Sequence, residues 1–382
     1  MPSFGRAIRR RFFLERGTAF LNHGSFGATP RAVLAAAERW RRRMEANPDR
    51  FMRKVLPGAL RAAAGRLARF LHAAERDVVF VENATSGLNA VLRSLEFKRG
   101  DEILATTHTY YAVRQALREV CRRTGASVVD AHIALPAADE ADLIEPIARR
   151  LGRRTRLVVL DHIASPTGLV FPVKRLAALA RARGARVLVD GAHAPGQVAL
   201  DLPALGADWY SGNCHKWLFA PKGCGFLWAR RGAQGNIHPP VISHGYGSGF
   251  TAEFDWTGTR DFSAWLAVPD ALDFFTSLGP AGLRAHNHRL VLAAAGRMAG
   301  AWGTALDGAP GLHGSMIAVR LPDALQRSDP RELMAELLAR HRIVAAVNPI
   351  DGVLWARISA QAYNVPADYA RLASAVPEMR DT

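Results

Sequence analysis

Short apolar runs alternate with longer amphipathic stretches through the middle of the chain, and this alternation constrains the fold more than any other feature. The runs have the length of buried strands, and the stretches between them have helical spacing. Such an order predicts an α/β fold with a mostly parallel sheet flanked by helices. The expected strands are residues 78–81, 102–106, 127–130, 157–160, 187–189 and 225–229, and the expected helices between them are residues 88–95, 112–123 and 173–183.

The two ends of the chain have a different pattern. Before the alternating region, Thr29 and Pro30 are typical of an N-cap and first helical residue, and a second helix is expected over residues 58–72. After about residue 275 we expect a smaller α+β domain, completed by the N-terminal segment. Its expected elements are helices 281–300 and 331–340 and strands 315–321, 341–347 and 353–359. The predicted division is residues 1–30, 31–274 and 275–382.

The basic composition raises the question of a nucleic-acid partner. The formal net charge is +16, with 50 Lys and Arg residues against 34 Asp and Glu residues. The arginines are spread along predicted helices among Ala and Leu, and no basic arm interleaved with aromatic residues occurs. This pattern is typical of solvated helix faces, so nucleic acid is not expected as a partner.

Membrane, metal and secretion signals are also not apparent in the sequence. No run of 18 apolar residues occurs, so no membrane span is expected. The basic start of the chain is not followed by the apolar region of a signal peptide. The three cysteines, Cys121, Cys214 and Cys224, form no C-x-x-C pair, which argues against a disulfide framework or a metal site. These observations predict a cytoplasmic protein without a bound metal.

Asp190 follows an expected strand, at the edge where α/β proteins bind their ligands, and Lys216 lies one further α/β element along the chain. Asp190 leaves the strand 187–189, and a buried carboxylate there needs a cationic or hydrogen-bonding partner such as a protonated ring nitrogen. Lys216 follows 26 residues later among aromatic and small residues. Desolvation would lower its pKa and make the amine nucleophilic toward an aldehyde. Taken singly, the first is also compatible with a turn cap and the second with a surface ion pair.

Two further strand ends carry suitable residues. Ala84 and Thr85 lie between the strand 78–81 and a helix N-terminus, where backbone N–H groups can bind a phosphate. Tyr110 follows the strand 102–106 and could stack on a flat cofactor ring. Each feature alone is equally typical of capping or packing.

Taken together, these motifs resemble fold-type-I enzymes that use pyridoxal 5′-phosphate (PLP), of the class V aminotransferase group and in particular its isopenicillin N epimerase-like branch. The resemblance extends over most of the chain. The motifs that carry it are Leu21–Gly24, Ser165–Gly168, Asp190–His193, Ser211–Trp217, Trp256–Asp261 and Arg357–Ser359.

The resemblance implies a role for each cofactor-site residue. Lys216 would hold PLP as a Schiff base and move the substrate Cα proton. Asp190 would pair with the pyridine nitrogen, His193 would lie near the ring hydroxyl, and Tyr110 would stack on the ring. The residues implied at the phosphate are Ala84, Thr85, Ser211, Asn213 and His215.

The resemblance also implies a shared site and a substrate contact. Gly258 and Thr259 would reach the phosphate held by a partner subunit, so a homodimer is expected. Arg357 would bind the substrate α-carboxylate through its planar fork, and Asn22 would be a second substrate contact. The expected substrate is therefore an amino acid.

Several reactions are compatible with these residues. Deprotonation of Cα followed by C–S β-elimination from a cysteine conjugate is the favoured prediction, with epimerisation and transamination as alternatives. Epimerisation needs a second proton donor, for which the candidates are His108, Tyr110 and Tyr111. A desulfurase that forms a persulfide is disfavoured because no cysteine follows Cys224.

Two functions of other classes are also compatible with parts of the sequence. A basic binding protein on a PLP fold would not need both Lys216 and Asp190. A nicotinamide dehydrogenase would need a strand–GxGxxG–helix unit. The glycine-rich segment 245–249 shows no following helical pattern and is interpreted as a flexible loop near the mouth of the site.

Overall fold

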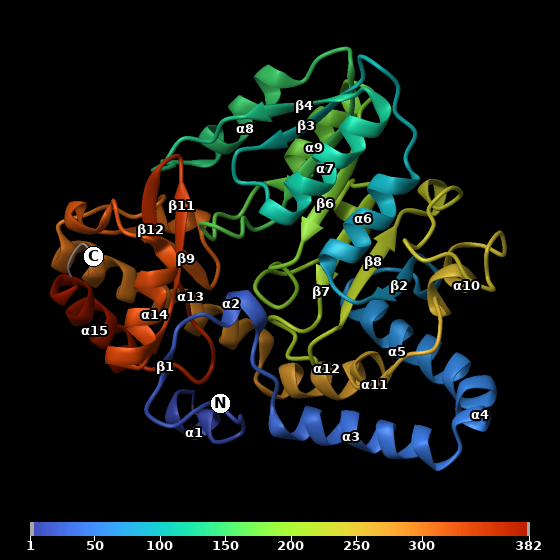
Figure 1. The fold of residues 1–382 in the computed structure, drawn as a ribbon, viewed down its shortest axis with the longest axis horizontal. Coiled ribbons are helices and arrows are strands. Elements are labelled where there is room, and N and C mark those ends of the chain that lie inside the picture. The colour runs from blue at the N-terminus through green and yellow to red at the C-terminus, as the bar shows by residue number, and fades with distance from the viewer. Residues whose placement is uncertain (1–3, 380–382) are drawn as a thin grey trace.

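The computed structural model describes residues 4–379, and its centre is a seven-stranded sheet in the order β2-β8-β7-β6-β5-β3-β4 (Figure 1). All strands are parallel except β8, which runs antiparallel to both of its neighbours. The fold class predicted from the sequence, a mostly parallel sheet flanked by helices, is confirmed. The strands are β2 (Val78–Val81), β3 (Glu102–Thr106), β4 (Ser127–Ala131), β5 (Thr155–Asp161), β6 (Arg186–Gly191), β7 (Trp209–Asn213) and β8 (Gly225–Ala229).

Helices cover both faces of this sheet because alternate residues of the strands point to opposite sides. In β2, Val78 and Phe80 join one apolar core, and Val79 and Val81 join the other. The helices on the first face are α3 (Arg31–Ala46), α5 (Leu56–Phe70), α8 (Glu140–Arg150), α9 (Val173–Ala182), α11 (Ser263–Leu266) and α12 (Val268–Ser277). Those on the second face are α6 (Ala84–Ser94), α7 (Tyr111–Thr124) and α10 (Phe250–Asp255).

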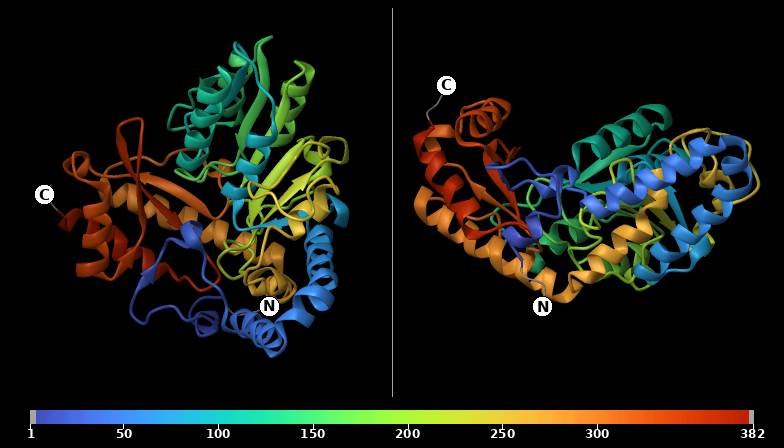
Figure 2. Two further views of the ribbon diagram at one scale, coloured as in Figure 1. Left: turned by 45° about the vertical axis from the view of Figure 1, so that its right-hand side comes forward. Right: turned by 90° about the horizontal axis from the view of Figure 1, so that it is seen from below.

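A smaller α+β part lies beside the large sheet and is joined to it by the long helix α13 (Figures 1 and 2). Its antiparallel sheet has the order β11-β12-β9, and three helices share a core with it. The elements are α13 (Pro280–Trp302), β9 (Met316–Arg320), α14 (Pro330–His341), β11 (Ala346–Ile350), β12 (Val353–Ser359) and α15 (Pro366–Ala375).

The N-terminal segment crosses from the smaller part to the large sheet. Its strand β1 (Ala19–Phe20) pairs in parallel with β10 (Ile343–Val344). The chain then forms the short helix α2 (His23–Phe26), which lies between the two parts, before it enters α3 (Figure 1). Two further short helices are α1 (Arg6–Arg9) and α4 (Pro48–Arg50).

Four local expectations are wrong in detail. Pro30 is the N-cap residue of α3, and the Thr29 hydroxyl donates to the carbonyl of Ala220 (3.1 Å) instead of capping the helix. The second helix begins at Pro48 and continues through a π-helical turn into α5, so it starts earlier than residue 58. The short helix α10 follows the glycine-rich segment 245–249. The single strand expected over 341–347 is divided between β10 and β11, which belong to different sheets.

The described residues contain neither a helix long and apolar enough to cross a membrane nor a cluster of three or more potential metal ligands among His, Cys, Asp and Glu. All three cysteines are free thiols. Cys214 and Cys224 are buried, and Cys121 is half-buried on α7.

Candidate active site

A cavity of about 510 Å³ opens at the carboxyl ends of β5, β6 and β7, where these parallel strands meet one edge of the sheet. Its lining residues lie in α2, at and after the end of β7, and after four of the strands that the sequence predicted. Of the residues predicted from the sequence, the cavity is lined by Ala84, Thr85, Tyr110, Asp190, His193, Asn213, His215 and Lys216.

Lys216 follows β7 and projects its amine into this cavity. Its Nζ lies 3.2 Å from Nε2 of His193. The pKa of Lys216 is lowered from 10.5 to about 7, mainly by burial and then by the charge of Arg357, while Asp190 opposes the shift. A substantial fraction of the amine is therefore neutral near pH 7 and able to react as a nucleophile or to accept a proton.

Asp190 and Asp161 form a pair of buried carboxyl groups at the ends of neighbouring strands, where their Cα atoms are register partners. Burial raises the pKa of both, and the charge of Asp190 raises that of Asp161 further. Asp190 is held by the backbone N–H of Ala192 (2.9 Å) and by the nearby Lys216. The proton of the pair therefore belongs on Asp161, and Asp190 is the carboxylate that faces a cationic group.

The first turn of α6 lines the same cavity, and side chains accept hydrogen bonds from two of its backbone N–H groups. Asn83 caps the helix, since its side chain accepts from the N–H of Ser86 (2.9 Å). The Oδ1 of Asn213 accepts from the N–H of Ala84 (2.8 Å), and the Ser211 hydroxyl contacts the carbonyl of Ala84 (3.1 Å). Ser211 thus lies behind this turn, outside the lining of the cavity, and supports its position.

A backbone carbonyl fixes the tautomer of His215. Its Nδ1 lies 2.9 Å from the carbonyl of Cys224, and a carbonyl can only accept, so Nδ1 carries a proton. Burial lowers the pKa of His215 to about 4. In the neutral ring Nε2 is an acceptor, and it becomes a second donor when a nearby anion holds the ring protonated.

Arg357 reaches the site from the smaller part. It alternates on β12 with Ala356 and Ile358, which point into the helix-covered core, so its side chain points the other way. One nitrogen, Nη2, lies 2.9 Å from both Asn22 Oδ1 and Ser25 Oγ. The other terminal nitrogen donates to the Ser165 carbonyl, and Nε is buried without a hydrogen bond. Arg357 does not itself line the cavity, but its partners Ser25 and Ser165 do, so the guanidinium lies directly behind the cavity wall.

His23 is a residue of the site that the sequence reasoning did not identify. It is fully buried, with Nε2 3.0 Å from the carbonyl oxygen of Lys216 and Nδ1 2.8 Å from the hydroxyl of Tyr363. Burial lowers its pKa to about 3, so the ring is neutral. Its Nε2–H therefore donates to Lys216, and the hydroxyl of Tyr363 donates to Nδ1. The only sequence signal was its place in the motif Leu21–Gly24.

The lining of the cavity differs from the predicted set of site residues in both directions. Gly258 and Thr259 lie between α10 and α11 and do not line the cavity of their own chain. Asn22 contacts Arg357 without itself lining the cavity. The lining residues that the sequence reasoning did not propose for the site include Ser25, Phe26, Asp161 and Ser165. Asp161 gave a signal of the same kind as Asp190, a carboxylate at the end of a buried strand.

A nucleophilic lysine opposite a buried carboxylate, at the carboxyl edge of this sheet and beside a helix N-terminus, defines a fold-type-I PLP enzyme. The family model for aminotransferase class V matches residues 20–346, and the chain belongs to this family.

Relatives and solved structures agree with the family. The chain is 36% identical over 392 residues to isopenicillin N epimerase of Amycolatopsis lactamdurans, covering 97% of each chain. It is 31% identical over 401 residues to L-cysteine desulfhydrase of Arabidopsis thaliana, covering 96% of this chain and 88% of the relative. A solved cysteine desulfurase from Thermococcus onnurineus NA1 has the same fold, with a TM-score of 0.83, 19% identity, and coverage of 99% and 100% of the two chains.

The residues of the cavity fit PLP, the cofactor of this family. Asp190 offers a carboxylate for the ring nitrogen, and Lys216 offers an amine for the aldehyde. At the N-terminus of α6, the positive end of the helix and the hydroxyls of Thr85 and Ser86 fit the phosphate.

Proposed function

We propose that this chain is a PLP-dependent C–S β-lyase that acts on L-cysteine or on an S-linked conjugate of cysteine. The substrate loses its Cα proton and then its Cβ–S bond, and hydrolysis of the remaining fragment gives pyruvate and ammonia. The sulfur leaves as sulfide or as the corresponding thiol. A relative that is 31% identical is an L-cysteine desulfhydrase, which supports this class of substrate.

The observation that carries the proposal is that two of the three residues expected as a second proton donor lie outside the lining of the cavity. Of the three candidates for the opposite face, His108 is buried and outside the lining of the cavity, and Tyr111 is exposed outside it. Only Tyr110 lines the cavity, and it is the residue proposed to stack on the ring. One base suffices for elimination, whereas epimerisation needs proton transfer on both faces.

The side chains of the site divide the work of this reaction. When bound, PLP supplies an electron sink for the negative charge that develops at the substrate Cα. Lys216 is the covalent attachment point and the base for the Cα proton, and His193 lies within hydrogen-bond distance of its amine. Asp190 keeps the ring nitrogen protonated. Arg357, with Asn22 beside it, binds the substrate α-carboxylate and fixes which Cα bond faces the base.

Phosphate contacts complete the proposed cofactor site. The residues proposed to hold the phosphate are Ala84, Thr85, Ser211, Asn213 and His215, with Ser211 acting through the turn of α6 that it supports. His215 would donate through Nε2 once the phosphate anion raises its pKa.

Persulfide chemistry does not fit the positions of the thiols. Neither of the buried cysteines, Cys214 and Cys224, lines the cavity, and Cys121 lies on α7 away from it. No cysteine follows Cys224 in the sequence. The sulfur therefore leaves with the product and is not transferred to the enzyme.

Epimerisation is the second candidate function. Two relatives of 35% and 36% identity are isopenicillin N epimerases, and among the three candidate donors Tyr110 lines the cavity. It would require the tyrosine to move a proton as well as contact the ring.

One experiment distinguishes the two functions. The PLP-loaded enzyme is incubated in deuterium oxide with L-cysteine, with S-substituted cysteines and with L-amino acids that lack a leaving group at Cβ. Stoichiometric pyruvate and ammonia from the sulfur-containing substrates is the expected result. Deuterium incorporation at Cα with loss of optical rotation and no pyruvate would replace the lyase with an epimerase.

We further propose a cytoplasmic homodimer with shared active sites. The exposed apolar side chains Phe26 and Tyr110 line the cavity, and exposed Val241 lines a neighbouring pocket that shares Glu82 and Ser86 with it. Exposed apolar residues grouped around a cavity are typical of a protein interface. Gly258 and Thr259 would then reach the phosphate site of the partner. The proposed units remain residues 1–30 with 275–382, and 31–274.

A further inference from the structure

A second large cleft, of about 630 Å³, lies between the N-terminal segment and α15 and shares no lining residue with the active site. Arginines from three elements surround it. We call it the arginine cleft, and its arginines are Arg6, Arg9, Arg10, Arg16, Arg31 and Arg371.

The positive charge of this cleft is almost uncompensated. Its lining contains one carboxylate, Asp368, whose Oδ2 accepts a hydrogen bond from the backbone N–H of Val365 (3.1 Å) at the start of α15. Within residues 4–379, none of the six arginines forms an ion pair with a carboxylate. Elsewhere in the described chain, many exposed arginines do form such pairs. Six cations around one cleft repel one another unless an anion lies between them.

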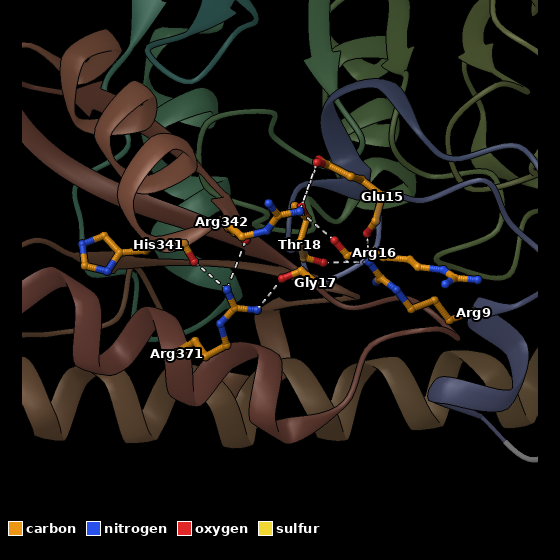
Figure 3. Close-up of polar contacts among 8 residues, drawn as sticks. All are labelled: Arg9, Glu15, Arg16, Gly17, Thr18, His341, Arg342 and Arg371. Atoms are coloured by element: carbon orange, nitrogen blue, oxygen red, sulfur yellow. Dashed lines mark hydrogen bonds and ion pairs between the residues drawn. The ribbon is translucent and has the colours of Figure 1, made fainter.

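Two of these arginines are fixed in place by neutral groups. Nη2 of Arg9 donates to the carbonyls of Glu15 (3.0 Å) and Thr18 (2.7 Å). Arg371 donates through Nη1 to the carbonyl of Gly17 (2.9 Å) and through Nη2 to that of His341 (2.5 Å). Figure 3 shows Arg9 and Arg371 converging on the turn of residues 15–18 from different segments. Carbonyl partners orient a guanidinium without neutralising its charge, so these cations are pre-organised.

The remaining arginines have free hydrogen-bonding capacity. The guanidinium groups of Arg6, Arg10 and Arg16 donate to no atom of the part of the chain that the structure describes, and all three are exposed. Nε of Arg31 donates to the carbonyl of Phe12 (3.2 Å), and its guanidinium lies over the ring of Phe13. The cleft thus combines a fixed cationic wall with exposed side chains that can close on a ligand.

We propose that the arginine cleft binds a small polyphosphate, either inorganic or the triphosphate portion of a nucleotide. The planar guanidinium group pairs with phosphate oxygens through two parallel hydrogen bonds. A ligand that engages several arginines at once must carry several negative charges close together. A single carboxylate or phosphate would leave most of the positive charge uncompensated. This site is distinct from the phosphate subsite of the cofactor at α6.

The test measures binding to the PLP-loaded enzyme, in which the cofactor occupies the other phosphate subsite. Tripolyphosphate and ATP are titrated by calorimetry into wild type and into the variant R6Q/R10Q/R16Q. In wild type, the three arginines replaced in this variant donate no hydrogen bonds within the described chain. The matched control, R43Q/R118Q/R153Q, removes the same charge from exposed positions outside the cleft.

One saturable site per chain is expected for wild type, with affinity that falls as ionic strength rises. The cleft variant should bind both ligands about tenfold or more weakly, and the control should bind them like wild type. Equal weakening by the cleft and control variants would overturn the proposal, because binding would then depend on net charge alone. Absence of saturable binding to wild type, or unchanged binding by a folded cleft variant, would overturn it too. Far-ultraviolet circular dichroism establishes that each variant is folded.

Discussion

Lys216 and Lys222 lie close in the sequence, yet only Lys216 projects into the cavity. Lys222 donates to the carbonyl of Gly27 (3.1 Å) and is a matched control. We predict that K216A loses the visible absorbance band that borohydride removes from wild type, and that its turnover falls by about 10²–10⁴-fold or more. K222A should keep the band. Spectra taken before and after borohydride, with pyruvate assays, measure both. A wild-type spectrum in K216A would assign the attachment to another amine.

The lowered pKa of Lys216 predicts a pH dependence for cofactor capture. Only the neutral amine attacks an aldehyde, so the rate at which apoenzyme binds PLP should rise as pH increases through about 7 and then level off. Arg357 lowers this pKa by charge repulsion, after the larger effect of burial. R357Q should therefore move the midpoint to higher pH, while keeping it below the value of 10.5 for a free lysine. Stopped-flow absorbance across the pH range measures both midpoints. A midpoint unchanged in R357Q would contradict this coupling.

At the scale of elements, Gly27, which follows α2, packs against the backbone of the loop that carries Lys216. Gly27 has φ of +69°, and a Cβ added to it would lie 2.1 Å from the carbonyl oxygen of His215. G27A should destabilise the fold by about 2–4 kcal/mol, because it combines an unfavourable φ with a backbone clash. The matched control is G58A on α5, where nothing lies within 4 Å of the added Cβ. It should stabilise by about 0.5–1 kcal/mol.

Urea unfolding curves test this pair of variants, provided that their m-values agree. The bound PLP per chain is measured in parallel, since displacement of the Lys216 loop should also reduce cofactor content in G27A. Equal midpoints for G27A and wild type would show that the N-terminal segment is not constrained by this contact.

Strands were predictable where buried and mostly apolar residues fill them. Residues 78–81, 102–106 and 225–229 are strands with the predicted bounds, since both faces of the sheet bury these side chains. β7 was not predicted as a strand, because its sequence ends in Ser211, Gly212 and Asn213. These small and polar residues belong to the site, so the strand is buried although its sequence lacks the apolar pattern of a buried strand. The division of 341–347 into two strands depends on pairing with distant β1, which no local pattern shows.

The site was predictable to the extent that strand ends and motifs reveal it. Lys216, Asp190 and Tyr110 all line one cavity, as expected from the shared carboxyl edge of the sheet. His23 could not be assigned a contact, because its partners are the Lys216 carbonyl and the hydroxyl of Tyr363, 340 residues away. Contacts of this separation depend on how the smaller part packs against the large sheet.

At the scale of the whole molecule, the site is assembled from separate parts of the chain. Lys216 and Asp190 belong to the large sheet, Arg357 belongs to the small antiparallel sheet, and Asn22 belongs to the segment between them. In the proposed function, the group that binds the substrate carboxylate and the reacting amine therefore belong to different parts of the molecule. A change in the relative position of these parts would alter the orientation of Cα to its base.

The proposed dimer extends this assembly to a second chain and makes a testable prediction. If Thr259 contacts the partner's cofactor phosphate, T259E should repel it and inactivate the neighbouring site. K216A inactivates only its own site. A heterodimer of one K216A chain and one T259E chain then keeps one intact site, formed by Lys216 of the second chain and Thr259 of the first, and should show about half of the wild-type activity per dimer.

Co-expression with two affinity tags yields this heterodimer, and the two homodimers of single variants serve as inactive controls. Activity in the heterodimer alone establishes that Thr259 acts across the interface. If the heterodimer is as inactive as both controls while its PLP content equals that of the K216A/wild-type heterodimer, Thr259 acts within its own chain. In that case the loop between α10 and α11 must move toward its own cavity, from which Gly258 and Thr259 are absent in the structure.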